Sequence, residues 1–103
     1  MTTKLLVLYR NPADAAAFDA YYRDTHVPLA KKIPGLKRYE VSAGPVRGLG
    51  PKSPYHLVAT LEFESMDALQ KALASPEGAA TAGDVANFAQ AGVEMMMFET
   101  TDA

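Results

Sequence analysis

The segment Tyr55-His56-Leu57-Val58-Ala59-Thr60-Leu61-Glu62-Phe63 decides the fold, because apolar and polar side chains alternate strictly along most of it. Successive residues of a β-strand point to opposite faces of a sheet, so the pattern predicts a strand over residues 55–63. We expect Tyr55, Leu57, Ala59, Leu61 and Phe63 on one face, and His56, Val58, Thr60 and Glu62 on the other. The segments on either side supply the remaining elements.

Two further strands are predicted before this segment. Residues 5–9 form a compact apolar run that is typical of a strand buried on both faces. Residues 36–43 predict the next strand, with Tyr39 and Val41 on one face. The loop between this strand and residue 55, Gly44 to Pro54, is rich in Gly and Pro and longer than a hairpin needs, so we expect a mobile flap.

A helix is predicted between the first two strands. Asn11 is suited to cap it, with Pro12 at its first position. Its buried stripe would consist of Phe18, Tyr21, Tyr22 and Thr25, which fall at helical spacing. Pro28 disfavours the α-helical conformation at Val27, so we expect the helix to break or kink near His26.

The segment after residue 63 predicts two helical pieces and a last strand. Ser65 is expected to cap a helix that carries Leu69, Ala72 and Leu73. Ser75, followed by Pro76 and Glu77, is expected to cap an Ala-rich helical segment that runs to about Phe88. Residues 93–100 predict the last strand.

The resulting order, β-α-β-β-α-β, predicts an α+β fold: a ferredoxin-like sandwich in a single domain over residues 1–103. Both helices would cover one face of an antiparallel sheet and leave the other face bare. The first and last strands are nevertheless apolar on both faces, through Leu6 and Leu8 in one and Met96 and Phe98 in the other. Soluble monomers rarely expose such a patch, so we expect a homodimer in which two sheets pack together.

Composition excludes several classes of function. The net charge is −2 and there is no run of Lys and Arg, so nucleic acid is not an expected partner. The chain has no Cys, which excludes disulfides and thiolate chemistry and fits a reducing cytoplasm. The short apolar run after Met1 fits neither a signal peptide nor a membrane span. The chain has two His and no acidic cluster near them, so we predict no metal site.

His26 is the strongest candidate for chemistry, because imidazole exchanges protons near neutral pH. It follows Tyr22 by four residues, so the two side chains share a face if the helix persists. The alternative is that His26 only ends the helix, where a cation complements the helix dipole. Tyr22 and Tyr39 are candidates for holding a substrate oxygen, although core packing with a satisfied hydroxyl is the alternative for each. Phe18, Tyr55 and His56 are candidate substrate-binding residues, and Tyr55 and His56 should point to opposite faces.

Two motifs resemble the signature of the EthD family, named for a protein of the ethyl tert-butyl ether degradation cluster. One is Tyr-Tyr-Arg-Asp-Thr-His-Val-Pro-Leu at 21–29, and the other is Ile-Pro-Gly-Leu-Lys-Arg-Tyr at 33–39. Residues 75–78, Asp84 and Phe88 resemble family members more loosely. The resemblance implies the dimeric α/β barrel superfamily, with a ferredoxin-like fold, a barrel formed by two sheets and a pocket between sheet and helices. Relatives in that superfamily include cofactor-free monooxygenases of polyphenols and isomerases of lactone intermediates.

We therefore expect a small-molecule protein without a cofactor. As an enzyme it would use His26 as general acid or base, with Tyr22 and Tyr39 orienting the oxygen of an aromatic or lactone-type metabolite. Isomerisation and oxygenation both fit this arrangement. The alternative is a binding or accessory protein of an oxidative pathway that uses the same pocket without chemistry.

Overall fold

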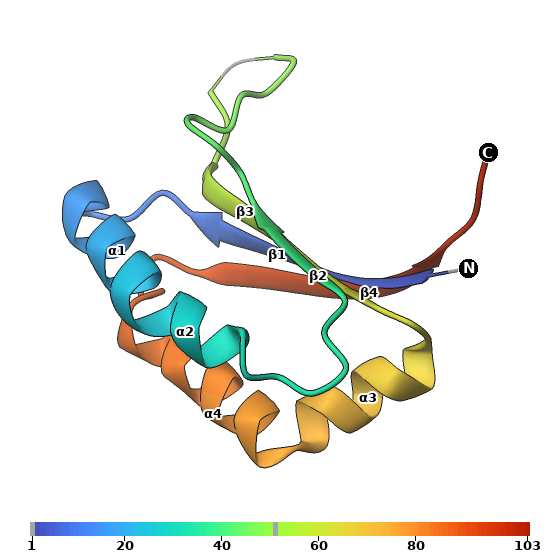
Figure 1. Ribbon diagram of the computed structural model, residues 1–103. Helices are drawn as coiled ribbons and strands as arrows, with labels where there is room; N and C mark the ends of the chain where they lie inside the picture. The colour runs from blue at the N-terminus through green and yellow to red at the C-terminus, as the bar shows by residue number, and fades with distance from the viewer. Residues whose placement is uncertain (1, 51) are drawn as a thin grey trace.

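The protein forms one antiparallel sheet of four strands, in the order β2-β3-β1-β4 (Figure 1). The structure is a computed structural model and describes residues 2–50 and 52–103; Met1, and Pro51 in the predicted flap, lie outside the described residues. The strands are β1 (Thr2–Arg10), β2 (Arg38–Val41), β3 (Tyr55–Phe63) and β4 (Val93–Thr100). This strand order confirms the predicted ferredoxin-like α+β fold.

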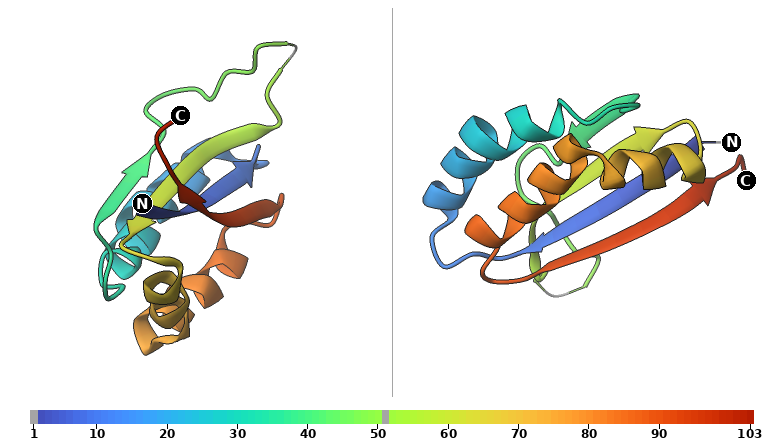
Figure 2. Two further views of the ribbon diagram at one scale, coloured as in Figure 1. Left: turned by 90° about the vertical axis from the view of Figure 1, so that its right-hand side faces the viewer. Right: turned by 90° about the horizontal axis from the view of Figure 1, so that it is seen from below.

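All helices lie on one face of the sheet, and the opposite face is bare (Figures 1 and 2). The first helical segment consists of α1 (Ala15–Tyr21), the π-helical turn η1 (Tyr22–His26) and α2 (Val27–Ala30). The second consists of α3 (Met66–Ala74), α4 (Pro76–Asp84) and the short 3₁₀ turn η2 (Val85–Asn87). This one-sided cover agrees with the prediction from the order of the elements.

The predicted strand boundaries hold for β3 and β4, while the first two strands differ from prediction. β1 starts three residues earlier than the apolar run of residues 5–9, because Thr2, Thr3 and Lys4 also pair with β4. β2 is shorter than the predicted 36–43, although Lys37 and Ser42 still donate backbone hydrogen bonds to β3. The apolar run therefore underestimates β1, whose first residues are mostly polar but still pair with β4.

The helix caps were predicted correctly in two of three places. Ser65 and Ser75 accept hydrogen bonds from the backbone N–H of Ala68 and Gly78, so both cap their helices as expected. The predicted cap at Asn11 is wrong. Asp14 caps α1 by accepting from Ala17 N–H, whereas the side-chain amide of Asn11 donates to the carbonyl of Ser53.

The helix does not break at Pro28, and the predicted departure of Val27 from the helical conformation is wrong, although the helix is irregular up to His26. Val27 keeps helical angles (φ −58°, ψ −46°), and its N–H donates to the carbonyl of Tyr22, five residues back. This wider π turn lets the chain continue into α2, where Pro28 lies in the first turn and no N–H is needed. The turn also shifts the buried stripe, so that Thr25 is exposed and His26 is buried.

An irregularity at the start of β3 changes which face two side chains take. Tyr9 pairs with Leu57 but Arg10 pairs with Tyr55, so His56 is an extra residue in a β-bulge. Tyr55 consequently lies on the bare face, where its hydroxyl donates to Glu94, while His56 contacts Phe18 on the helical face. The prediction that the two point to opposite faces holds. The predicted face of each is wrong, because the bulge shifts the alternation by one residue.

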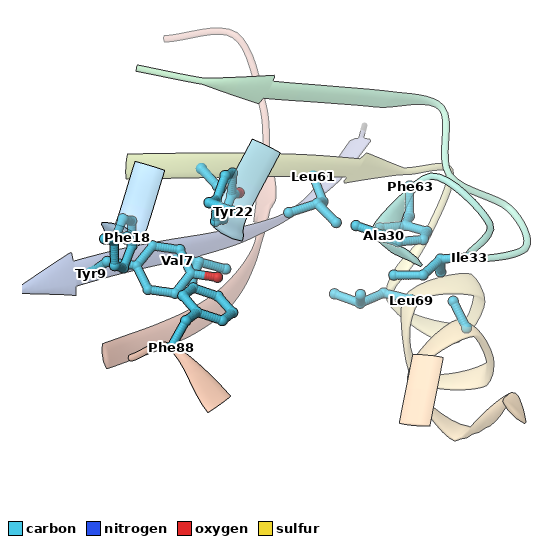
Figure 3. Packing of buried hydrophobic residues seen from close by; sticks show 12 residues of the cluster. Val7, Tyr9, Phe18, Tyr22, Ala30, Ile33, Leu61, Phe63, Leu69 and Phe88 are labelled. Atoms are coloured by element: carbon cyan, nitrogen blue, oxygen red, sulfur yellow. The ribbon is translucent and has the colours of Figure 1, made fainter. Parts of the chain in front are cut away.

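The core lies between the sheet and the helices, and Figure 3 shows two groups of side chains within it. Aromatic residues gather at one end, where Phe18 and Tyr22 from the first helical segment meet Tyr9 and Phe88. Aliphatic residues and Phe63 fill the other end, together with Leu69 from α3. The aromatic end is where the candidate functional residues lie.

Candidate functional site

His26 is buried at the end of η1 and forms a hydrogen-bonded pair with Asp84. The side chain of His26 is 5% exposed and that of Asp84 7%, and 2.9 Å separates His26 Nδ1 from Asp84 Oδ2. Asp84 is the last residue of α4, so the pair joins the two helical segments. Asp84 Oδ1 also accepts hydrogen bonds from the hydroxyl of Tyr21 at 2.6 Å and the amide of Asn87 at 3.0 Å. Both carboxylate oxygens are therefore satisfied.

The pair fixes the protonation pattern of the imidazole. Burial lowers the pKa of His26 below its ordinary value of 6.5, although the hydrogen bond and the charge of Asp84 act in the opposite direction. Burial alone would raise the pKa of Asp84, but the hydrogen bonds from Tyr21, Asn87 and His26 outweigh it and hold the pKa below its usual value. A neutral imidazole beside an ionised carboxylate carries its proton on Nδ1. Nε2 is then the nitrogen that can accept a proton.

Tyr22 and Tyr39 lie next to this pair and are hydrogen-bonded to each other. Their hydroxyl oxygens are 2.5 Å apart, and the Tyr22 ring centroid is 5.2 Å from that of His26. Burial raises the pKa of both phenols, and their mutual interaction raises that of Tyr22 further. Both therefore stay protonated at neutral pH; one hydroxyl proton lies in their mutual hydrogen bond, and the other can be donated to a ligand oxygen.

A cavity of about 60 Å³ brings the three residues together. Tyr22, His26 and Tyr39 all line it, as predicted from helical spacing and the family motif. The remaining wall is almost entirely apolar and includes Val7 and Leu61 from the sheet. A few polar groups in an apolar enclosure are typical of small-molecule sites. The catalytic role of these residues stays a prediction.

The three predicted substrate-binding residues lie outside the wall of this cavity. Phe18 is buried and stacks on Tyr22, with ring centroids 6.0 Å apart. His56 lies on the helical face, and its Nε2 is 2.7 Å from Asp19 Oδ1. The hydroxyl of Tyr55 is bound to Glu94 on the bare face of the sheet, away from His26. Phe18 thus packs against a residue of the cavity wall, Tyr22, whereas Tyr55 does not reach the cavity.

Asp84 matches the family loosely in sequence, but its pairing with His26 was not predicted. It stands 58 residues after His26, so spacing gives no hint of their contact. One signal was available, because a carboxylate at the C-terminus of a helix opposes the helix dipole. An unfavourable charge in such a position indicates that another group, here His26 with Tyr21 and Asn87, compensates for it.

The described residues were also searched for a metal site and for a membrane-spanning helix. Within residues 2–50 and 52–103, no three or more His, Cys, Asp or Glu side chains gather where they could hold a metal ion. Across the same residues, no helix combines the length and the apolar character that crossing a membrane requires.

A ferredoxin-like sheet with helices on one face and a buried His–Asp pair beside an apolar cavity defines a small α+β protein with a candidate proton-transfer site. The EthD domain model matches residues 10–92, and the chain belongs to the EthD family. A Rhodococcus erythropolis protein, described as an uncharacterized 11.0 kDa protein in the thcB-thcC intergenic region, is 47% identical over 95 residues, which are 90% of this chain and 89% of that protein. A crystal structure of an EthD family protein from Bacillus halodurans is 35% identical, with a TM-score of 0.89 over 98% of this chain and 100% of that one.

More distant solved structures share the fold. SnoaB from Streptomyces nogalater, described as a cofactor-independent oxygenase, is 19% identical with a TM-score of 0.64, over 99% of this chain and 94% of that one. A dimeric ferredoxin-like protein from Thermobifida fusca is 19% identical with a TM-score of 0.72, over 97% of this chain and 92% of that one. At these identities the likeness concerns the fold.

Proposed function

We propose that the protein performs proton-transfer chemistry on an aromatic or lactone-type metabolite without a cofactor. The observation that carries this proposal is the buried His26–Asp84 pair, which leaves Nε2 of His26 as a base beside the hydroxyls of Tyr22 and Tyr39. The fold shared with SnoaB, itself described as a cofactor-independent oxygenase, is compatible with such chemistry.

In this mechanism His26 Nε2 removes a proton from an acidic O–H or C–H of the ligand. The imidazolium that forms is stabilised by the carboxylate of Asp84, which remains ionised. Of the Tyr22 and Tyr39 hydroxyls, the one that does not donate to the other donates a hydrogen bond to the oxygen on which negative charge develops. Return of the proton to a different atom of the ligand gives an isomerisation. Reaction of the deprotonated ligand with dioxygen would instead give an oxygenation: a CH2 carbon of the ligand is oxidised to a carbonyl that keeps one oxygen atom, and the other oxygen atom leaves as water.

The competing proposal is a binding or accessory role without turnover. The mutual hydrogen bond between the hydroxyls of Tyr22 and Tyr39 supports this role, because neither phenol is left without a partner when the pocket is empty. In this case the pocket would hold a ligand for another enzyme of an oxidative pathway.

Asp84→Asn separates these two proposals, because it keeps the shape of the side chain and removes the charge that stabilises the imidazolium. A panel of hydroquinones, naphthols and unsaturated lactones would be followed by absorbance and by oxygen uptake. For any compound that is turned over, we expect Asp84→Asn and His26→Gln to lower kcat by about 10²–10⁴-fold. Asp67→Asn, an exposed position on α3, is the control. Turnover that survives both site variants would contradict the proposed mechanism.

We also propose that the chain acts in the cytoplasm as a homodimer whose bare sheet faces pack together. Leu6, Leu8 and Val58 are half-buried on that face, while Met96 and Phe98 of β4 are 48% and 40% exposed. Burial of such a patch against a second copy removes apolar surface from water. The dimeric description of the Thermobifida fusca protein with this fold supports the same assembly.

A further inference from the structure

The cavity beside His26 is too small for the ligand class proposed above. An engineered cavity that takes up benzene measures about 150 Å³, whereas this one measures about 60 Å³. An aromatic metabolite can therefore place only a small part of itself against His26. If the proposed function is correct, the larger part must lie in another hollow that adjoins the cavity.

A groove of about 610 Å³ meets this requirement. It is lined by residues of the first helical segment, by residues of β2 and β3, and by the start of the 44–54 loop. Its volume is within the range of about 300–1,000 Å³ that is usual for small-molecule sites. Tyr22 lines both the groove and the cavity, so the two spaces approach each other at this side chain.

The groove contains a second His–carboxylate pair, formed by His56 and Asp19. Their Nε2–Oδ1 distance is 2.7 Å, and the His56 side chain is 22% exposed. The His56 ring packs edge-on against Phe18, which in turn stacks on Tyr22. Aromatic rings thus connect the outer pair with the inner pair of His26 and Asp84.

The β-bulge is what places His56 in the groove. Without the extra residue, the alternation of β3 would direct His56 to the bare face of the sheet, as the sequence pattern predicted. Bulges are over-represented next to active sites, where they redirect a side chain. The bulge at His56 does not add to the β1–β3 pairing, because it leaves His56 without a partner on β1.

We propose that the groove is the outer part of the ligand site and that His56, held by Asp19, binds it. The ligand class is a planar aromatic of two or more rings with an oxygen substituent at each end. One oxygen reaches the Tyr22–Tyr39–His26 cavity and the other forms a hydrogen bond with His56. Tyr22 forms the wall past which the reacting end enters. This inference rests on the proposed function, and the experiment below distinguishes the two.

Two probes that differ in a single hydroxyl test the inference. Naphthalene-1,5-diol carries an oxygen on each ring, and 1-naphthol lacks the second one. By isothermal titration calorimetry, we expect the diol to bind more tightly than 1-naphthol. His56→Ala should lower the affinity for the diol roughly fivefold, which is the effect expected from the loss of one hydrogen bond. The affinity for 1-naphthol should change less than twofold. In ¹⁵N spectra, the amides of Asp19, Ser42 and His56 should shift when the diol is added.

Asp19→Asn is the second variant, because its exposed side chain can be changed without disturbing the core. Asp19→Asn should also lower the affinity for the diol. Asp67→Asn on α3 should leave the affinities for the diol and for 1-naphthol unchanged. Equal affinity of wild type and His56→Ala for the diol, or no binding of the diol by wild type, would overturn the inference even if His26→Gln abolishes turnover. Weaker binding by His56→Ala, with turnover unaffected by His26→Gln, would support the groove and reject the proposed catalysis.

Discussion

His26 is an imidazole with almost no contact with water, yet it keeps an ionised carboxylate as its partner. Burial favours the neutral ring, and Asp84 favours the charged one. Because burial is the larger effect on its pKa, the ring is neutral at pH 7, and Asp84 orients it through the hydrogen bond to Nδ1. A helix-capping role for His26 would need no such partner, and a helix-dipole role would need a charged ring.

The pH dependence of stability tests this description of His26. The native pKa lies below the ordinary value of 6.5, so below that pH the unfolded chain binds a proton that the native protein does not. The free energy of unfolding should therefore fall as the pH decreases from about 7 through 6.5, by up to about 1.4 kcal/mol per unit of pH. The loss should level off at the native pKa of His26. Urea unfolding between pH 8 and pH 5 measures it.

His26→Gln is the control for this prediction, because glutamine does not titrate. The variant is expected to lose stability at pH 8 but to show a flatter dependence between pH 7 and pH 5 than the wild type. Asp84 affects the pH dependence only in a more acidic range. Its native pKa is depressed, so its contribution to the free energy of unfolding is present above the ordinary pKa of 3.8 and is lost as the pH falls below that value. Identical slopes for wild type and His26→Gln would mean that the native pKa of His26 is not lowered.

At the scale of elements, irregular backbone places the candidate residues. The π turn of η1 and the bulge of β3 each add one residue to a regular repeat. The sequence predicted β3, β4 and two Ser caps because their patterns are local and periodic. It could not predict an inserted residue, whose cause lies in packing across the core. The pairing of His26 with Asp84 was hidden for the same reason, since it depends on how α4 packs against the first helical segment.

The corner between α3 and α4 determines where Asp84 lies, and Gly78 allows it to form. A Cβ atom on Gly78 would lie 2.0 Å from the carbonyl oxygen of Ala72, which is backbone and cannot rotate away. We expect Gly78→Ala to lower the free energy of unfolding by about 2–4 kcal/mol, as other large steric changes in a core do. It should also weaken any activity, because α4 must shift and Asp84 shifts with it. Chemical denaturation measures the change in stability.

Gly83→Ala is a matched control in the same helix. No atom lies within 4 Å of the position its Cβ would take, so only helix propensity changes. Alanine is favoured over glycine in a helix by about 0.8–1.0 kcal/mol, and Gly83→Ala should therefore be neutral or stabilising. A loss of stability in both variants would indicate that α4 is sensitive to any substitution, and the close approach at Gly78 would then not be its cause.

At the scale of the whole molecule, the two faces of the sheet have different environments. The helices cover one face, where the core and both His–carboxylate pairs lie. The other face carries Leu6, Leu8 and Met96 in adjacent positions of β1 and β4, and the structure has no element over it (Figure 2). The sequence predicted this asymmetry, because the order of elements places both helical segments on the same side.

The register of β4 makes the homodimer prediction specific to one side chain. Met96 pairs with Leu6 and lies on the bare face, whereas Met97 pairs with Leu5 and lies on the helical face, and the two are 48% and 47% exposed. If the bare faces pack together, Met96→Glu buries an unpaired charge in the interface, which costs about 3–5 kcal/mol. Met97→Glu places the same charge outside it. We expect wild type and Met97→Glu to sediment at about twice the 11.0 kDa chain mass, and Met96→Glu to sediment as a monomer at micromolar concentration. Dissociation by Met97→Glu alone would instead place the partner on the helical side of the β4 edge, and a monomeric wild type would rule out the dimer.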